Sequence, residues 1–429
     1  MKAFLMPMLA AALLAPAASA QPVIGVAPPQ TEQQQAGRAL TLASAVDRAQ
    51  QQNSELLALR AEVDALEART AQARALPNPT LEYLREGTRD QGGSAALQVS
   101  IPLELGGKRG ARVDAAMAEM RVAAADLTAG RLRVQAEVVA AFHEVYLAQR
   151  RLELATQTSA SARQSSQSAS ARVVAGKISP VEETRAKVAE ANLQVEAIQA
   201  RRELAEARVK LALLWGGDAA TLSVLAAPDL PLPRAVNEAA IAAGLAQAPS
   251  LQRATADLDW RTAAARLERS QRYPDLSVIV GQKREGVGRE RQTIVGLSVP
   301  LPVFDRNQGA IREADRRIEK SRAELVFNQQ RVAAEAAQAA IRLNAALDQE
   351  RVIREEVLPG GQSAFAAART GFEAGKFNFL EVLDAQRTYF QAQAQHLRTI
   401  SEAHRAAADL ATLIGLALPN STFHQQDAK

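Results

Sequence analysis

The sequence predicts a mainly α-helical fold with a transmembrane β part, built from two copies of a strand–strand–long-helix repeat. Three observations predict it. The chain repeats itself at an interval of nearly 200 residues. Each copy carries a long stretch with apolar or small residues at a seven-residue period, and in the first copy that stretch is free of proline. Each copy also carries two short segments of alternating polarity.

The repeat rests on four pairs of anchors in the same order. Pro77 pairs with Pro274 at a shift of 197 residues, and "SIPL" at 100 pairs with "SVPL" at 298 at a shift of 198. "AGK" at 175 pairs with "AGK" at 374, and Gly216 pairs with Gly415, both at a shift of 199. Each half is therefore expected to be one supersecondary unit. The proline-rich stretch Ala227–Arg234 separates the two halves. The predicted parts are a first repeat at 41–216, a linker at 217–235, a second repeat at 236–416 and a tail at 417–429.

The N-terminus reads as an export signal. Lys2 supplies a positive start, Phe4–Ala15 is apolar, and Ala18–Ala20 is an A-x-A-like cleavage site. A membrane anchor is the alternative, but the apolar stretch is shorter than the roughly 20 residues that a spanning helix needs. We expect a signal peptide at 1–20 and an N-terminal extension at 21–40.

Within each half the order is helix, two strands, very long helix, break and helix. Thr41–Leu76 and Val236–Arg272 read as the first helices, each stopped by a proline. No proline occurs between Leu103 and Ser179, where apolar or small residues follow a 3.5-residue repeat. A helix over Ala111–Ala175 would be about 100 Å long at 1.5 Å per residue. The second half keeps the seven-residue period from Ile311 to Ile353.

The alternating segments read as strands. Three alternate clearly, around Ala95–Ile101, Leu276–Val280 and Val295–Val299, while Leu81 and Tyr83 fit more weakly. Polar, glycine-containing loops at Gly87–Gly93 and Glu285–Glu290 join them in pairs. Their length suits a tilted strand that crosses a bilayer, although an ordinary soluble hairpin gives the same alternation.

Four strands cannot close a barrel by themselves, and open strand edges are not tolerated in lipid. Two copies would give about eight strands, whose interior side chains fill. Three copies would give about twelve, which is wide enough for a pore. The strand count therefore predicts a homotrimer with a 12-stranded β-barrel in a lipid bilayer.

Composition argues against several other functions. The absence of cysteine excludes disulfides, thiolate metal sites and a lipidated N-terminal cysteine. The net charge of +4 comes from 51 basic and 47 acidic residues without a basic block, so no nucleic-acid partner is expected. The four histidines show no metal-ligand spacing. "GGKRG" at Gly106–Gly110 lacks the remaining phosphate-loop residues and more simply turns a strand into a helix. We expect no cofactor, no bound metal and no catalytic residue.

From about Leu40 to Leu418 the chain resembles the TolC-type outer membrane factor (outer membrane efflux protein) family. The pieces that carry the resemblance are "ARTGFEAGKFNFLEVLDAQRTYF" at 368–390 and its counterpart "ARVVAGKISPVEETRAK" at 171–187. "VPLPVFDRNQGAI" at 299–311 resembles the heavy-metal branch, the cobalt–zinc–cadmium (CzcC-like) proteins.

The resemblance implies a trimeric barrel in the cell outer membrane, continued by a periplasmic α-helical barrel. It implies a passive exit duct, joined to a periplasmic adaptor (membrane fusion) protein and an inner-membrane resistance–nodulation–division pump. The heavy-metal branch implies divalent cations as cargo. Drug efflux or type I protein secretion is the alternative, and a soluble periplasmic coiled-coil scaffold is a third hypothesis. An enzyme is the least favoured class.

Two sets of candidate site residues follow. The "AGK" stretches lie where a long helix must reverse, and the resemblance implies that these tips meet the adaptor: Ala175, Gly176, Lys177, Ala374, Gly375 and Lys376. Just beyond the tips, the resemblance places an acidic pore gate at Glu182, Glu381 and Asp384. Arg185 stands at the first-half position that matches Asp384, so the gate is not symmetric. A solvated helix face is the simpler interpretation of these acids.

Overall fold

The computed structural model describes residues 40–87, 93–219, 222, 232–285, 291–374, 376–377 and 379–415. These residues belong to the unit Ala39–Lys429, and the fold below is that of this unit. The predicted signal peptide and the tail at 417–429 lie outside the described residues, as do most of the N-terminal extension and most of the linker.

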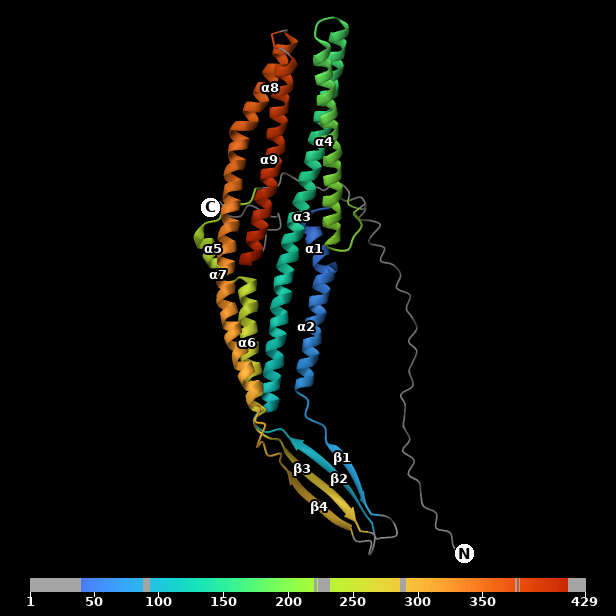
Figure 1. The fold of residues 1–429 in the computed structure, drawn as a ribbon, viewed down its shortest axis with the longest axis vertical. Coiled ribbons are helices and arrows are strands. Elements are labelled where there is room, and N and C mark those ends of the chain that lie inside the picture. Colours follow the sequence, from blue (N-terminus) through green and yellow to red (C-terminus); the bar gives the residue numbers. More distant parts are fainter. Residues whose placement is uncertain are drawn as a thin grey trace, which may run out of the picture. The chain divides into compact units, whose positions relative to one another are not determined.

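The two halves share one element order (Figure 1). The first contains α1 (Leu42–Gln52), α2 (Ser54–Ala73), β1 (Thr80–Glu86), β2 (Ser94–Leu103), α3 (Lys108–Val174) and α4 (Pro180–Leu213). The second contains α5 (Glu238–Leu245), α6 (Pro249–Ser270), β3 (Leu276–Arg284), β4 (Arg291–Ser298), α7 (Gln308–Val352), the π-helical segment η3 (Ile353–Val357), α8 (Leu358–Glu373) and α9 (Phe379–Ile414). The predicted mainly α fold with two strands in each repeat is confirmed.

The first helix of each half is broken where one continuous helix was predicted. Asn53 ends α1 and caps α2, because its side-chain oxygen accepts a hydrogen bond from the Leu56 N–H at 3.1 Å. Its amide also donates to the Leu214 carbonyl at 2.9 Å, which holds the break against the end of α4. In the second half Pro249 starts α6, a position that tolerates the missing N–H of proline.

The long helix of the first half is a single element. α3 runs for 67 residues, which corresponds to about 100 Å. Gly107 precedes it with φ of 72°, a left-handed conformation that glycine adopts without steric cost. Asn307 occupies the equivalent place before α7 with φ of 57°. "GGKRG" is thus the turn from strand to helix that the sequence predicted.

The long helix of the second half is interrupted, which the seven-residue pattern did not predict. The π-helical η3 separates α7 from α8, and Pro359 follows in the first turn of α8. Proline removes one backbone donor, and a local π turn accommodates the lost hydrogen bond. The buried carboxylate of Glu350, just before η3, lies 3.1 Å from both Arg354 Nε and His396 Nε2.

Two alanine-rich cores hold the helices together. One lies among α1, α3 and α4 around Phe142 and Leu211, and the other among α7, α9 and α5 around Leu343 and Ile414. α3 joins the two halves, because it packs against α6 and α9 as well as against α2 and α4. Small side chains allow this close approach but bury little apolar area per residue.

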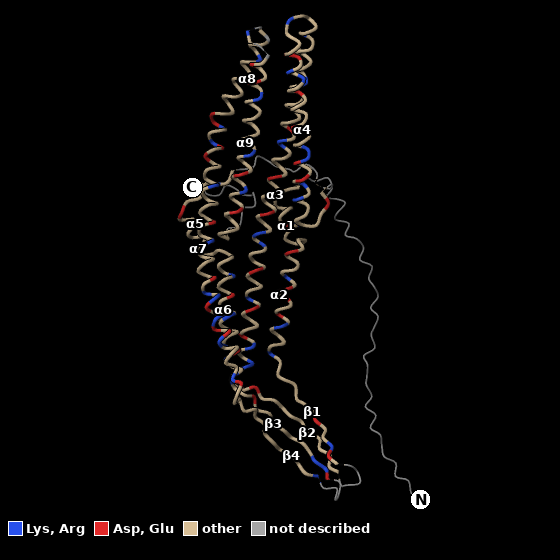
Figure 2. The backbone as a smooth tube through the Cα atoms, in the orientation of Figure 1, with Lys and Arg blue, Asp and Glu red and all other residues tan. Residues whose placement is uncertain are grey.

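The four strands form one antiparallel sheet in the order β1-β2-β3-β4. The pairing of β2 with β3 joins the two repeats, with Val99 opposite Val280. β1 and β4 are the edges, so each has one unpaired side within the chain. Figure 2 shows charged residues along the helices, whereas those on the strands gather toward the hairpin loops.

Candidate functional site

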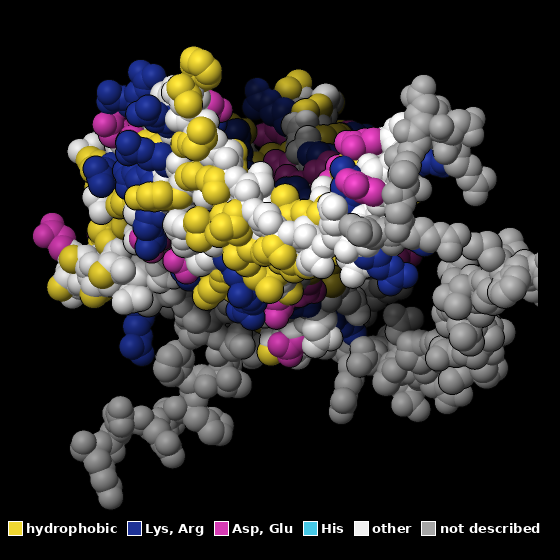
Figure 3. All heavy atoms as spheres, turned by 90° about the horizontal axis from the view of Figure 1, so that it is seen from below, with side chains coloured by type: hydrophobic (Ala, Val, Ile, Leu, Met, Phe, Trp, Pro, Cys, Tyr) yellow, Lys and Arg dark blue, Asp and Glu magenta, His cyan; other side chains and the backbone are white. Residues whose placement is uncertain are grey.

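The sheet has one apolar face and one mainly polar face. The strand registers place large apolar side chains of all four strands on the same side, and most of them are exposed: Leu81, Tyr83, Leu97, Val99, Ile101, Leu103, Leu276, Val278, Val280, Val295 and Leu297. Seen from the sheet end, hydrophobic side chains form a band across the molecule (Figure 3). Exposed apolar surface of this extent marks a face that contacts lipid or another protein.

The opposite face carries the polar side chains. Gln98 donates to the Glu82 carboxylate at 2.6 Å, and Ser94 donates to Glu86 at 3.3 Å. Lys283 lies 3.7 Å from the same Glu86 carboxylate. The remaining positions of this face are mostly small or polar, and the large apolar side chains among them are Leu84, Ile279 and Ile294. The alternation apolar-out and polar-in is typical of strands between lipid and a water-filled interior.

The first helix tip is a tight reversal between α3 and α4. Gly176 has φ of 67°, and its N–H donates to the Val173 carbonyl while the Lys177 N–H donates to the Arg172 carbonyl, both at 2.9 Å. Ser179 then caps α4, with Pro180 at its first position. The tip residues Ala175, Gly176 and Lys177 are exposed, so they are free to meet another molecule.

The second tip follows the same plan as far as it is described. The Lys376 N–H donates to the Gly371 carbonyl at 2.8 Å, and Ala374 and Lys376 are exposed. Gly375 lies outside the described residues. The two tips contact each other, because the Arg172 guanidinium stacks 3.9 Å from the centre of the Phe372 ring. Ile178 and Leu383 pack beside this pair.

The predicted gate residues lie just beyond the tips, on two helices. Glu182 is half-buried in the first turn of α4, and Glu381 and Asp384 are exposed at the start of α9. The neighbouring Glu183 accepts from Ser170 at 2.8 Å, and Lys187 together with that hydroxyl lowers the pKa of the Glu183 carboxyl. Acidic side chains thus occupy the first turn after both tips, where a helix N-terminus favours negative charge.

The structure also brings together two histidines that sequence spacing kept apart. The rings of His143 on α3 and His404 on α9 lie 3.9 Å apart between their centres, buried in the seam between the repeats. Nδ1 of His143 and Nε2 of His404 have no hydrogen-bond partner in the described part of the chain. Burial lowers the pKa of His143 to about 3, with a contribution from His404, and lowers the pKa of His404 to about 4.

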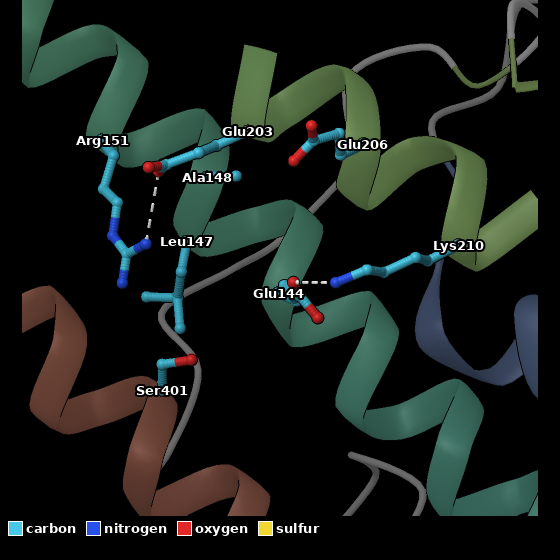
Figure 4. A pocket seen from close by; sticks show the side chains of 8 residues that line it. All are labelled: Glu144, Leu147, Ala148, Arg151, Glu203, Glu206, Lys210 and Ser401. Atoms are coloured by element: carbon cyan, nitrogen blue, oxygen red, sulfur yellow. Dashed lines mark hydrogen bonds and ion pairs between the residues drawn. The ribbon is translucent and has the colours of Figure 1, made fainter. Parts of the chain in front are cut away.

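One helical turn from this pair, α3, α4 and α9 enclose a cavity of about 160 Å³ (Figure 4). Two ion pairs cross it between α3 and α4, Lys210 with Glu144 at 2.9 Å and Arg151 with Glu203 at 3.5 Å. Leu147 of α3 and Ser401 of α9 also line it. Across the described ranges no three His, Asp or Glu side chains cluster in a way that could hold a metal ion.

Within the described residues, no helix combines the length and the apolar character that a membrane crossing requires. The candidate site consists of the amphipathic sheet together with the tips of the long helices. A duplicated sheet of this kind, continued by long helices, defines a channel-forming protein of the outer membrane.

Comparison with known proteins identifies the family. The model of the family described as "Outer membrane efflux protein" matches residues 45–217 and 240–416. The chain is 39% identical to the cobalt-zinc-cadmium resistance protein CzcC of Cupriavidus metallidurans, over 88% of this chain and 90% of the relative. It is 31% identical to the nickel-cobalt-cadmium resistance protein NccC of Alcaligenes xylosoxydans, over 62% and 61%.

Among solved structures, a membrane protein from Pseudomonas aeruginosa matches with a TM-score of 0.77 at 23% identity, over 87% of this chain and 92% of that one. The chain belongs to the outer membrane efflux protein family. It is an outer-membrane protein with a periplasmic helical part, as the sequence predicted. Outer membrane efflux channels of the TolC type form trimers and work with adaptor and pump partners.

The sequence predicted the tips and the gate, which stay predictions, and it assigned no role to the residues of the polar sheet face. The alternation at 95–101 was the available signal for Gln98. Glu82 required the register of β1 against β2, which only the structure supplies. The histidine pair left no signal in the sequence, because its members lie 261 residues apart (404 − 143).

Proposed function

We propose that three copies of this chain form the exit duct of a tripartite efflux system for divalent heavy-metal cations of the cobalt, zinc, cadmium or nickel type. The duct is passive: it joins a periplasmic adaptor and an inner-membrane resistance–nodulation–division pump, and the pump supplies the energy. The repeats that build it span 41–216 and 236–416. The observation that carries the proposal is the amphipathic sheet with two unpaired edges.

The internal duplication supports closure by further copies. The most extensive contacts between the first repeat and the second are β2 with β3, α3 with α6, and α3 with α9. Their equivalents would pair β4 with β1, α7 with α2, and α7 with α4. In the described chain β4 and β1 are opposite edges of the sheet, and α7 packs extensively only against elements of its own repeat. Another copy can supply all three missing contacts at once.

Three copies fit the sheet best. β1 and β4 run antiparallel to each other, so β4 of one copy can pair with β1 of the next in the same antiparallel manner. Twelve strands leave a water-filled interior lined by the polar face, whereas eight strands would be filled by side chains. The apolar face then contacts the lipid of the outer membrane.

The exposed tips are the proposed contact with the adaptor, through Ala175, Gly176, Lys177, Ala374, Gly375 and Lys376. The first tip follows the end of α3 that is opposite the strands, about 100 Å of helix away. Behind them Glu182, Glu381 and Asp384 would repeat around the trimer axis as rings of carboxylates. Such rings attract cations and set selectivity in pores.

The proposal that the cargo is a metal ion is supported by the names of the relatives. CzcC and NccC are named for resistance to cobalt, zinc, cadmium and nickel, and the match to CzcC covers most of both chains. A passive pore need not bind what it conducts, so the cargo is better tested in cells than on the site.

Deletion of the gene tests the proposal. We expect the deletion strain to become sensitive to zinc, cadmium, cobalt or nickel salts more than to dyes and detergents, and a plasmid copy to restore resistance. The matched control is deletion of the adaptor gene, which should give the same profile. Sensitivity to dyes alone would refute the metal cargo and favour a drug channel, while unchanged sensitivity to every compound would refute the efflux role.

A further inference from the structure

Three arginines form one row across the sheet. The registers place Arg85 of β1 opposite Ala95 of β2, Ala95 opposite Arg284 of β3, and Arg284 opposite Arg291 of β4. Residues opposite one another across neighbouring strands point to the same face of a sheet. Arg284 and Arg291 are therefore neighbours, Arg85 lies in the same row on the far side of Ala95, and all three are exposed on one face.

This face is the apolar one. Two residues before Arg85 along β1 stands Tyr83, and the same cross-strand row contains Leu97, Gln282 and Thr293. From Ala95 to Leu103 the strand rises about 26 Å at 3.3 Å per residue, which matches the apolar band of roughly 25 Å on outer-membrane barrels. The arginine row thus lies at the loop end of that band, where the lipid tails give way to headgroups.

The charge of the row is uncompensated on its own face. The four strands contribute no acidic side chain to the apolar face. Arg85, Arg284 and Arg291 make no hydrogen bond or ion pair within the described part of the chain. Lys283, one residue from Arg284 on the opposite face, is by contrast paired with Glu86. A row of exposed guanidinium groups on a lipid-facing rim, with no acidic side chain on the same face of the described strands, is suited to the anionic groups of a lipid surface.

We infer that this arginine row binds the phosphate groups of lipid headgroups in the outer leaflet of the outer membrane. Guanidinium matches phosphate with two parallel hydrogen bonds, and partial exclusion of water strengthens them. Tyr83 sits one row below, the depth at which aromatic side chains mark a membrane interface. The inference rests on the proposed membrane trimer, in which nine such arginines would surround the rim.

The test compares the purified trimer with a triple variant, Arg85→Gln, Arg284→Gln and Arg291→Gln. Native mass spectrometry would titrate both with lipid A that carries its phosphates and with the same lipid after dephosphorylation. We expect the wild type to prefer the phosphorylated lipid and the triple variant to lose about 100-fold in affinity for it, from roughly fivefold for each cation near an anionic surface. Lys283→Gln removes a positive charge at the same height from the polar face and should leave binding unchanged.

A further variant tests whether a loss of lipid binding comes from damage to the fold. Arg284→Lys keeps the charge but loses the paired hydrogen bonds, so it should weaken binding several-fold with an intact trimer. The inference would be overturned if the wild type bound both lipids equally, or if Lys283→Gln lost as much affinity as the triple variant. Neither result would contradict the proposed channel function. A wild-type protein that forms no trimer in detergent would instead overturn the proposed function on which the inference rests.

Discussion

At the scale of single residues, the buried histidine pair gives the seam between the repeats a dependence on pH. His143 and His404 have pKa values of about 3 and about 4 in the fold, below the 6.5 of an exposed histidine. Below pH 6.5 the unfolded chain therefore binds protons that the folded chain does not. Stability is lost as the pH falls through this window, at about 1.4 kcal/mol per pH unit for each group.

We expect the wild-type protein to lose about 4 kcal/mol of stability between pH 7 and pH 5 from these two groups together. Replacing both by leucine should abolish that part of the loss, because no group at the seam then takes up a proton. Thermal unfolding in detergent at both pH values measures it. Leu147→Ala, a cavity variant in the same seam, should lower stability equally at both values. A double variant that keeps the full acid sensitivity would contradict the assignment.

The acidic residues behind the tips belong to the same scale. Glu381 and Asp384 share one face of α9 at a spacing of three residues, and three copies would bring that face together around the pore. We expect Glu381→Gln with Asp384→Asn to change single-channel conductance and its response to divalent ions, since the ring loses six carboxylates. Trimer yield should stay normal.

The control for the gate is Glu196→Gln, an exposed carboxylate farther along α4. It should leave conductance and the divalent response unchanged. Wild-type conductance in the double variant would show that the acids are an ordinary solvated helix face.

At the scale of elements, α4 carries an apolar stripe with no partner in the described chain. Val181, Val188 and Val195 recur every seven residues and are 58%, 55% and 52% exposed. This spacing is that of a helix that packs along another helix. The duplication indicates the partner: α9 packs against α3 within the chain, so α4 should pack against α7 and α8 of the next copy.

A charge in this stripe should therefore weaken assembly. We expect Val188→Asp with Val195→Asp to reduce the trimer at least tenfold, because each unpaired carboxylate buried at an interface costs several kcal/mol. The fraction of trimer in detergent-solubilised membranes measures it. Gln194→Glu adds a charge to α4 at an exposed position that lies about 100° around the helix from Val195, outside the stripe, and should assemble normally. Equal assembly of the two proteins would exclude the stripe from the interface.

The helices and strands also show which structural features a sequence pattern can predict. Alternation and the repeat predicted all four strands, and Gly176 marked the first tip, because these features depend on local backbone preferences. The break at Asn53 was missed since it depends on the Leu214 carbonyl, which is 161 residues away. The arginine row and the histidine pair depend on register and on helix packing between the halves. No periodicity within one half contains that information.

At the scale of the whole molecule, the central claim is that the chain is one third of a closed channel. The sheet has two open edges, α7 lacks the partners that α3 has, and the stripe on α4 is exposed. Each of these features is unfavourable in a monomer and is removed by the same cyclic arrangement. The thin alanine-rich cores add to the argument, because long helices with little buried area gain stability from neighbouring copies.

The native mass of the protein extracted from outer membranes into detergent tests this claim most directly. The account predicts a species of three times the mass of the mature chain. The trimer should persist on dilution, since strand pairing and helix packing close together at each interface. A stable, well-folded monomer in buffer without detergent, or a dimer in detergent, would contradict it.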